Sequence, residues 1–271
     1  MINNIWSVSL GKILIIIFVL LTIFWVISQT FFPESYDLQE LYADSYFILA
    51  LLGGFAGIVA SKKWGGTKSI MGKACLLFSM GLFAQAFGQM VYSYYALFLN
   101  MEVPYPSIGD IGFFGSIPLY LIAVFLLGKA SGVKFSKQTF SQRVIAISIP
   151  VVVLVFSSVF FLNDYDFSDK TSLEVFLDFA YPLGQASYLS LTITVYLLSN
   201  KLLGGIMRNK VLFVFAALIV QYLADIIFLY QATHGEWTAG GINDYIYTIA
   251  YFIMGLSLVK LKIAYDELSR N

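Results

Sequence analysis

Eight long apolar stretches run through this chain, and the charged residues in the gaps between them alternate in sign. Every second gap is basic, and the gaps between are acidic apart from Lys170. The basic residues are Lys12, then Lys62, Lys63, Lys68 and Lys73, then Lys129, Lys134, Lys137 and Arg143, then Lys201, Arg208 and Lys210, then Lys260, Lys262 and Arg270. The acidic residues are Glu34, Asp37, Glu40 and Asp44, then Glu102 and Asp110, then Asp164, Asp166, Asp169, Glu174 and Asp178, then Glu236 and Asp244. About 20 apolar residues cross a bilayer as a helix, and cytoplasmic loops carry an excess of lysine and arginine. The pattern predicts a multi-pass protein of the cell membrane with both termini in the cytoplasm.

The composition excludes a soluble globular domain. Hydrophobic residues make up 59% of the chain and charged residues only 12%, too few to cover a globular surface. A net charge of zero gives no basis for binding nucleic acid, and we predict no such partner. The single cysteine, Cys75, excludes an internal disulfide and a thiolate metal cluster, and the single histidine, His234, excludes a multi-histidine site. We therefore predict no metal site and no cofactor.

The eight stretches predict an all-α integral membrane bundle, because a spanning segment must satisfy its backbone hydrogen bonds internally. The predicted transmembrane helices are 11–29, 44–61, 74–99, 109–128, 144–162, 173–199, 211–232 and 242–261. The first could be mistaken for a signal peptide with Lys12 as its basic region, but no small-residue cleavage site follows Ser28. We interpret it as an uncleaved anchor.

Polar residues recur at a fixed spacing in the two halves of the chain. Matched aspartates, 134 residues apart, are Asp44 with Asp178 and Asp110 with Asp244. Further matches, 136 residues apart, are Gln85 with Gln221, Gln89 with Asp225 and Tyr94 with Tyr230. Any two apolar helices resemble each other, but a match between polar residues does not follow from apolar bias. We predict two parallel four-helix repeats, residues 1–134 and 135–271, because four spans return the chain to its starting side.

One carboxylate is predicted within the apolar part of a span. Asp225 lies fifteen residues beyond Lys210, about 22 Å along a helix, in the outer part of the bilayer. A carboxylate at mid-membrane costs roughly 2.5 to 3.5 kcal/mol, so such a residue usually faces the bundle interior and has a partner or a task. The alternative interpretation is a protonated side chain that joins helices by bonding a backbone carbonyl or a tyrosine.

The aspartates that open the even-numbered spans, with nearby glutamines and tyrosines, are expected to line a polar pocket open to the outer half of the bilayer. The candidate ligand-binding residues are Asp225, Asp110, Asp178, Asp244, Asp44, Gln89, Gln221, Gln185 and Tyr181. Two alternatives stay open. Ser107 with Asp110, and Asn243 with Asp244, are typical of helix N-caps, and many of the tyrosines fit an aromatic belt at the membrane surface.

Three segments carry a resemblance to a known class of membrane region. They are PSIGDIGFFGSIPL at 106–119, DFAYPLGQ at 178–185, and Ala224-Asp225 followed by Gly241 and Asp244. Together they resemble the uncharacterised eight-transmembrane regions that precede GGDEF diguanylate cyclases, PAS domains and histidine kinases in bacteria and archaea. Gln185 stands where that pattern has aspartate, and Gly109 where it has alanine. The resemblance implies eight spans and a role in signalling, and the charged tail after the last span fits the start of a signalling linker.

Three classes of function fit these observations. The leading hypothesis is a sensory or ligand-binding module that takes a small or lipophilic ligand and signals through its cytoplasmic C-terminal helix to a cytoplasmic partner. A small-solute transporter is the second, because parallel repeats and mid-depth polar residues fit alternating access, although the inner halves of the spans have few polar residues. An intramembrane lipid-modifying enzyme with paired carboxylates is the third. No Ser–His or Cys–His pair can be built, so no catalytic residue is assigned.

Overall fold

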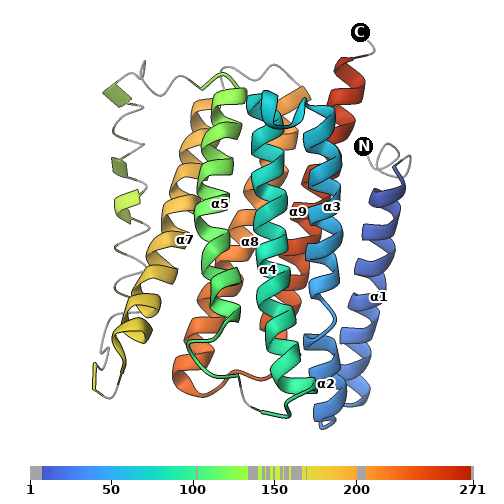
Figure 1. The fold of residues 1–271 in the computed structure, drawn as a ribbon, viewed down its shortest axis with the longest axis vertical. Coiled ribbons are helices and arrows are strands. Elements are labelled where there is room, and N and C mark those ends of the chain that lie inside the picture. Colours follow the sequence, from blue (N-terminus) through green and yellow to red (C-terminus); the bar gives the residue numbers. More distant parts are fainter. Residues whose placement is uncertain are drawn as a thin grey trace.

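The computed structural model of the chain is all-helical (Figure 1). The structure describes residues 8–101, 103–133, 170–199 and 206–269, with scattered residues between 140 and 168. Helices make up 84% of the described residues, which contain no strand. The helices are α1 (Ser9–Phe31), α2 (Tyr36–Ala43), α3 (Phe47–Lys63), α4 (Ile70–Leu97), α5 (Gly109–Ala130), α7 (Ser172–Ser199), α8 (Ile206–His234) and α9 (Ile242–Leu268), with a short 3-10 helix at Gly66–Lys68.

Six of the described helical segments are long and apolar enough to cross a membrane, judged by length and composition. They are α1, α2 together with α3, α4, α5, the 211–232 part of α8, and α9. A helical, membrane-like fold is therefore confirmed. The helix α7 is not among the six, because polar side chains such as Gln185 and Thr192 interrupt its apolar sequence. The predicted span 144–162 lies mostly outside the described residues.

Helix boundaries differ from the predicted spans in two ways. Several helices are longer than predicted. The helix α9 continues to Leu268, because hydropathy detects only the apolar part of a helix and not its polar end. The second predicted span, 44–61, corresponds to α3, but the short helix α2 precedes it. The chain leaves helical hydrogen bonding between the two, which puts Asp44 and Tyr46 at a junction.

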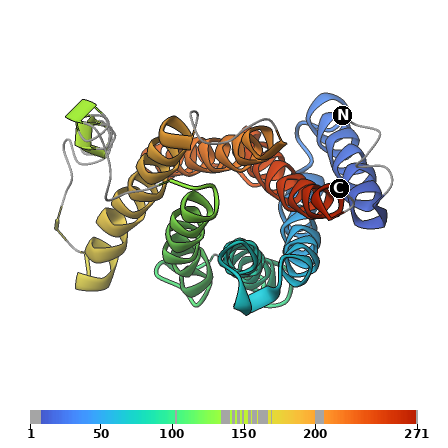
Figure 2. The same cartoon turned by 90° about the horizontal axis from the view of Figure 1, so that it is seen from above.

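The larger helices form a ring, apart from α1. In Figure 2, α3, α4 and α5 face α7, α8 and α9. Each helix packs against its neighbour in the order α3, α4, α5, α7, α8, α9, and α9 packs against α3 to close the ring. The first three helices and the last three therefore meet at two seams, α5 with α7 and α9 with α3.

The helix α1 lies outside the ring against α9, α3 and α2. Phe18 stacks on Phe252 with ring centroids 3.9 Å apart, and Trp25 stacks on Tyr245 at 4.3 Å. The opposite side of α1 exposes large apolar side chains, including Ile16, Leu20 and Ile23. Such a surface is suited to lipid and unsuited to water.

Charge separates the two ends of the bundle. The basic end, at the top of Figure 1, holds the start of α1, the end of α9 and the lysines Lys12, Lys62, Lys63, Lys68, Lys73, Lys129 and Lys262. The acidic end holds the starts of α5, α7 and α9, with Asp110, Glu174, Asp178 and Asp244. At the basic end, Asp266 of α9 pairs with Lys262 at 2.5 Å and Lys63 at 3.9 Å. Trp64 donates its indole N–H to the Leu261 carbonyl at 2.8 Å, which fixes the end of α9 on the turn after α3.

Glycines bring α3 and α9 together at their seam. A Cβ added to Gly53 would lie 3.1 Å from the Cα of Gly255, and one added to Gly255 would lie 3.2 Å from the Cα of Gly53. Because neither residue has a side chain, the two backbones approach as closely as small residues allow in membrane helices.

Candidate functional site

Asp244 is held at the acidic end by one partner from its own loop and one from another helix. It lies in the first turn of α9 and is 3% exposed. Its Oδ2 accepts a hydrogen bond from the Gly240 backbone N–H at 2.7 Å. The hydroxyl of Tyr46, just before α3, lies 3.3 Å from Oδ1 of Asp244 and 3.0 Å from Oε1 of Gln89. The single hydroxyl proton of Tyr46 is therefore shared between an aspartate of α9 and a glutamine of α4.

The loop before α9 has the backbone geometry that this contact requires. Gly240 has φ +71°, a value that favours glycine, and an added Cβ would collide with the Gln39 carbonyl of α2. The Gly240 carbonyl accepts hydrogen bonds from Trp25 Nε1 at 3.0 Å and Gln29 Nε2 at 3.2 Å, both on α1. Contacts with α1 and α2 thus position the amide that Asp244 binds.

Asp110 has the same kind of environment at the seam between α5 and α7. Its Oδ2 accepts from the Ser107 N–H at 2.7 Å, and the Gly109 N–H donates to Ser107 Oγ at 3.1 Å, a reciprocal cap. Tyr181 of α7 donates its hydroxyl to the other oxygen, Oδ1, at 2.7 Å. Asp110 is 6% exposed. The expected cap at Ser107 is observed, and a tyrosine from a neighbouring helix completes it.

Asp178 and Asp44 lie closer to the surface of the bundle. Asp178 accepts from the Tyr105 hydroxyl at 2.7 Å and pairs with Lys170 at 2.7 Å. Burial, and then the nearby Asp178 acceptor, raise the pKa of Tyr105, so this loop hydroxyl stays a donor. Asp44 ends α2 half-buried beside Ser93 of α4.

Asp225 differs from Asp110 and Asp244 because only one of its oxygens has a close donor. It lies on α8, about 14 Å before the end of that helix. Its Oδ1 accepts from the Tyr247 hydroxyl of α9 at 2.5 Å. Gln221 Nε2 lies 3.4 Å from Oδ1 and 3.5 Å from Oδ2, beyond the usual range of about 2.7 to 3.2 Å. Among the described residues no lysine or arginine pairs with Asp225, and its side chain is partly accessible. Its Oδ2 therefore keeps capacity to accept a hydrogen bond.

Five tyrosines lie at or next to the surroundings of Asp225, and we call them the tyrosine group: Tyr46, Tyr120, Tyr188, Tyr247 and Tyr251. Tyr46 belongs to the group through its ring contacts with Tyr247 and Tyr251. The rings of Tyr46, Tyr247 and Tyr251 pack with centroids 6.0, 6.1 and 6.4 Å apart. Tyr120 of α5 meets Tyr188 of α7 edge to face at 6.1 Å. Tyr247 contacts Asp225 directly, and Tyr120, Tyr188 and Tyr251 lie within electrostatic range of it. Helices from both halves of the ring thus supply aromatic side chains around one carboxylate.

Hydrogen bonding within the tyrosine group is uneven. Tyr251 donates to Gln85 Oε1 at 3.0 Å, and Gln85 Nε2 donates to Ser116 Oγ at 2.7 Å, so this chain crosses from α9 through α4 to α5. The hydroxyl of Tyr188 is different. It is 1% exposed and has no hydrogen-bond partner within the described parts of the chain. A buried hydroxyl left unpaired costs about 1 to 3 kcal/mol.

The structure brings some predicted site residues together and separates others. The observed groupings are Asp244 with Gln89 through Tyr46, Asp110 with Tyr181, and Asp225 with Gln221. The first two groups lie at different seams of the ring. Gln185 is buried on α7. Asn243 does not cap α9, since the cap position is Gly241 and both polar atoms of the Asn243 side chain lack partners among the described residues.

The sequence analysis named Asp244, Tyr181 and Gln185 but missed Tyr247, Tyr251 and Tyr188, which lie on the same faces of α9 and α7. On α9, Asp244, Tyr247 and Tyr251 follow the spacing of one helical face, as Tyr181, Gln185 and Tyr188 do on α7. This spacing was the available signal. A buried lysine was also missed. Lys260, interpreted only as a cytoplasmic marker, is 7% exposed, and its Nζ lies 2.9 Å from the centroid of the Phe213 ring on α8.

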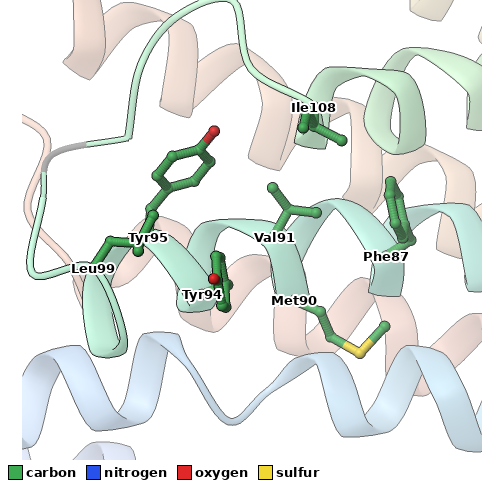
Figure 3. Close-up of a pocket in the computed structure, with 7 residues that line it drawn as sticks. All are labelled: Phe87, Met90, Val91, Tyr94, Tyr95, Leu99 and Ile108. Carbon is green, nitrogen blue, oxygen red and sulfur yellow. The ribbon is translucent and has the colours of Figure 1, made fainter.

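A shallow groove of about 310 Å³ lies on the outer surface of α4 near the acidic end (Figure 3). Its lining is almost wholly apolar and consists of Phe87, Met90, Val91, Tyr94, Tyr95, Leu99 and Ile108. Most of these side chains are exposed. On a membrane-spanning helix such a surface suits an acyl chain, so the groove adds no polar chemistry to the site.

Comparisons with known proteins found no family model that matches the chain and no match among curated proteins or solved structures. The resemblance to eight-transmembrane signalling regions therefore stays a prediction.

Proposed function

We propose that this protein is a sensory or ligand-binding module of the cell membrane, with a polar site in the outer half of the bilayer and an output through its C-terminal helix. In this proposal the chain has eight spans in two parallel four-helix repeats, residues 1–134 and 135–271. The basic end faces the cytoplasm, because lysines gather there. Both termini are then cytoplasmic, and the acidic end faces outward.

The observation that carries the proposal is the incomplete bonding of Asp225. A carboxylate inside a membrane bundle is expensive unless it has partners or a task. Asp225 has one short hydrogen bond, from Tyr247, and a second oxygen without a close donor among the described residues. Its side chain is partly accessible. A ligand that places a donor or a positive charge at Oδ2 would supply what Asp110 and Asp244 obtain from the protein.

A route for the output is provided by α9. This helix runs unbroken from Ile242 to Leu268, about 40 Å. Near its acidic end it presents Tyr247, the close partner of Asp225. At its basic end Asp266 and the Leu261 carbonyl bond to Lys63 and Trp64 next to α3. A shift of Tyr247 on ligand binding would therefore be carried as a rigid-body movement to the cytoplasmic contacts of α9.

A transporter is the second candidate, favoured by the ring of two facing sets of three helices. Alternating access needs a path to both sides of the membrane. Toward the basic end, however, the side chains buried between the described helices are mainly apolar, among them Phe78, Leu127 and Leu258. This favours a module that binds from the outer side over one that releases a solute inside.

The experiment combines mass spectrometry and distance measurement on the full-length protein in nanodiscs. Native mass spectrometry of wild-type protein, purified with its native lipids, should detect a bound small molecule that Asp225→Asn loses. In a Cys75→Ala background, spin labels at Thr67→Cys and Leu268→Cys report the distance between the turn after α3 and the end of α9. Asp225→Asn should change that distance distribution.

The matched control is Asp37→Asn, the same substitution on an exposed aspartate of α2 at the acidic end. It should keep both the bound molecule and the wild-type distances. Retention of the molecule by Asp225→Asn, with wild-type distances, would contradict the proposal. Flux of a solute into proteoliposomes that depends on Asp225 would favour the transporter instead.

A further inference from the structure

We infer that the site at Asp225 binds a small organic ammonium ion, with the cation against the Asp225 carboxylate and the rings of the tyrosine group and a polar end at the Tyr188 hydroxyl. This rests on the proposed function, and it names the chemical class of the ligand.

The first argument is charge. Asp225 is the only acidic residue in the described, apolar part of α8, and no described lysine or arginine pairs with it. A cation is the natural complement of such a carboxylate. A divalent metal fits poorly, because the described residues contain no group of three or more histidine, cysteine, aspartate or glutamate side chains, and Ca²⁺ takes six to eight oxygen ligands. The remaining class is a monovalent cation that needs one carboxylate only.

The second argument is the aromatic surroundings. The Tyr247 hydroxyl donates to Asp225 at 2.5 Å, and the Tyr251 ring packs on Tyr247 at 6.1 Å, both on α9. Tyr120 of α5 and Tyr188 of α7 pack on each other at 6.1 Å and lie within electrostatic range of Asp225. Tyrosine rings attract ammonium groups through their negative faces, and aromatic cages of this kind bind quaternary ammonium ions. Apolar residues in the same positions would bury the same area without this attraction, so the tyrosine rings favour a cation over a neutral ligand.

The third argument is the unpaired hydroxyl. Tyr188 is 1% exposed, and its oxygen has no hydrogen-bond partner among the described residues. A ligand that has both a cation and a hydrogen-bonding group could pair with the Asp225 carboxylate and with this hydroxyl at once. An amino alcohol has both groups in one small molecule.

Calorimetric titration of full-length protein in nanodiscs tests the inference with three probes. Choline has the cation and the hydroxyl, tetramethylammonium has only the cation, and 3,3-dimethylbutan-1-ol has choline's shape without its charge. Wild-type protein should bind choline saturably and the neutral alcohol not at all. Asp225→Asn should weaken choline binding about tenfold or more. Tyr188→Phe should weaken choline about fivefold and leave tetramethylammonium unchanged, because only a hydrogen bond is lost.

Asp37→Asn is the control and should bind choline like wild-type protein. Equal binding of the neutral alcohol, wild-type affinity in Asp225→Asn, or no binding of either cation would overturn the inference. Folding of each variant is checked by its thermal unfolding, and Tyr188→Phe tests the site even if Asp225→Asn unfolds. Loss of a native bound molecule from Asp225→Asn, without choline binding, would refute the ligand class alone. Choline binding without a change in the Thr67–Leu268 distance would refute the sensory output alone.

Discussion

Asp225 and the pair Asp110 and Asp244 are all aspartates within a membrane-like helix bundle, yet their bonding differs. Asp110 and Asp244 each accept a backbone N–H from the preceding loop on one oxygen and a tyrosine hydroxyl from another helix on the other. Asp225 has one short bond, from Tyr247, on a single oxygen. A carboxylate that the protein has fully satisfied stabilises the fold, whereas one left incomplete is available to something else. Four predictions test this contrast, from the largest expected effect on stability to the smallest.

Asp244→Ala should cause the largest loss. It leaves the buried Gly240 N–H without an acceptor, which costs about 1 to 3 kcal/mol. It also removes one of the two acceptors of the Tyr46 hydroxyl, whose remaining acceptor is Gln89. We expect a decrease of about 3 kcal/mol in the free energy of unfolding, measured by denaturant titration in mild detergent. The matched variant Asp225→Ala should lose only about 1 kcal/mol. Equal losses of unfolding free energy in Asp244→Ala and Asp225→Ala would contradict the contrast.

Asp110→Ala should lose about 2 kcal/mol in the same titration. It also removes two bonds, from Ser107 and Tyr181. Both donors are partly accessible in the structure, so water can replace the aspartate more easily than at Asp244. A loss larger than that of Asp244→Ala would show that the burial of the donors does not determine which variant is less stable.

The variants Tyr46→Phe and Tyr247→Phe compare the tyrosine that donates to Asp244 with the one that donates to Asp225. Tyr46 is 3% exposed and serves both Gln89 and Asp244, so its loss should cost about 2 kcal/mol. Tyr247 is partly accessible and serves Asp225 alone, so we expect about 1 kcal/mol. Thermal unfolding of the two variants side by side measures the difference, and the reverse order would contradict it.

Asp266→Asn should have the smallest effect, about 0.5 kcal/mol or less, because its ion pairs with Lys63 and Lys262 are solvated at the basic end. Raising the salt concentration should remove even this difference, since screening weakens exposed pairs. A salt-resistant loss comparable to that of Asp110→Ala would mean that the end of α9 is held more firmly than its exposure indicates.

The sequence predicted the helices well and the site only in part. Apolar length alone identified each described helix from α1 to α9 except the short α2, whose polar sequence carries little hydropathy signal. The Ser107 cap was predictable because its partner lies three residues away. The tyrosine partners of Asp110 and Asp244 were not, since they come from helices 71 and 198 residues distant. Tyrosine fits a membrane surface and a bundle interior equally well, and only the packing of the helices separates the two.

The glycine contact between Gly53 and Gly255 has a consequence for biosynthesis. It joins α3 to a helix that is synthesised much later, so the side of α3 that meets α9 stays without its partner while the helices between them are made. During that time the seam is open, and lipid or another protein can occupy the surface that Gly255 later covers.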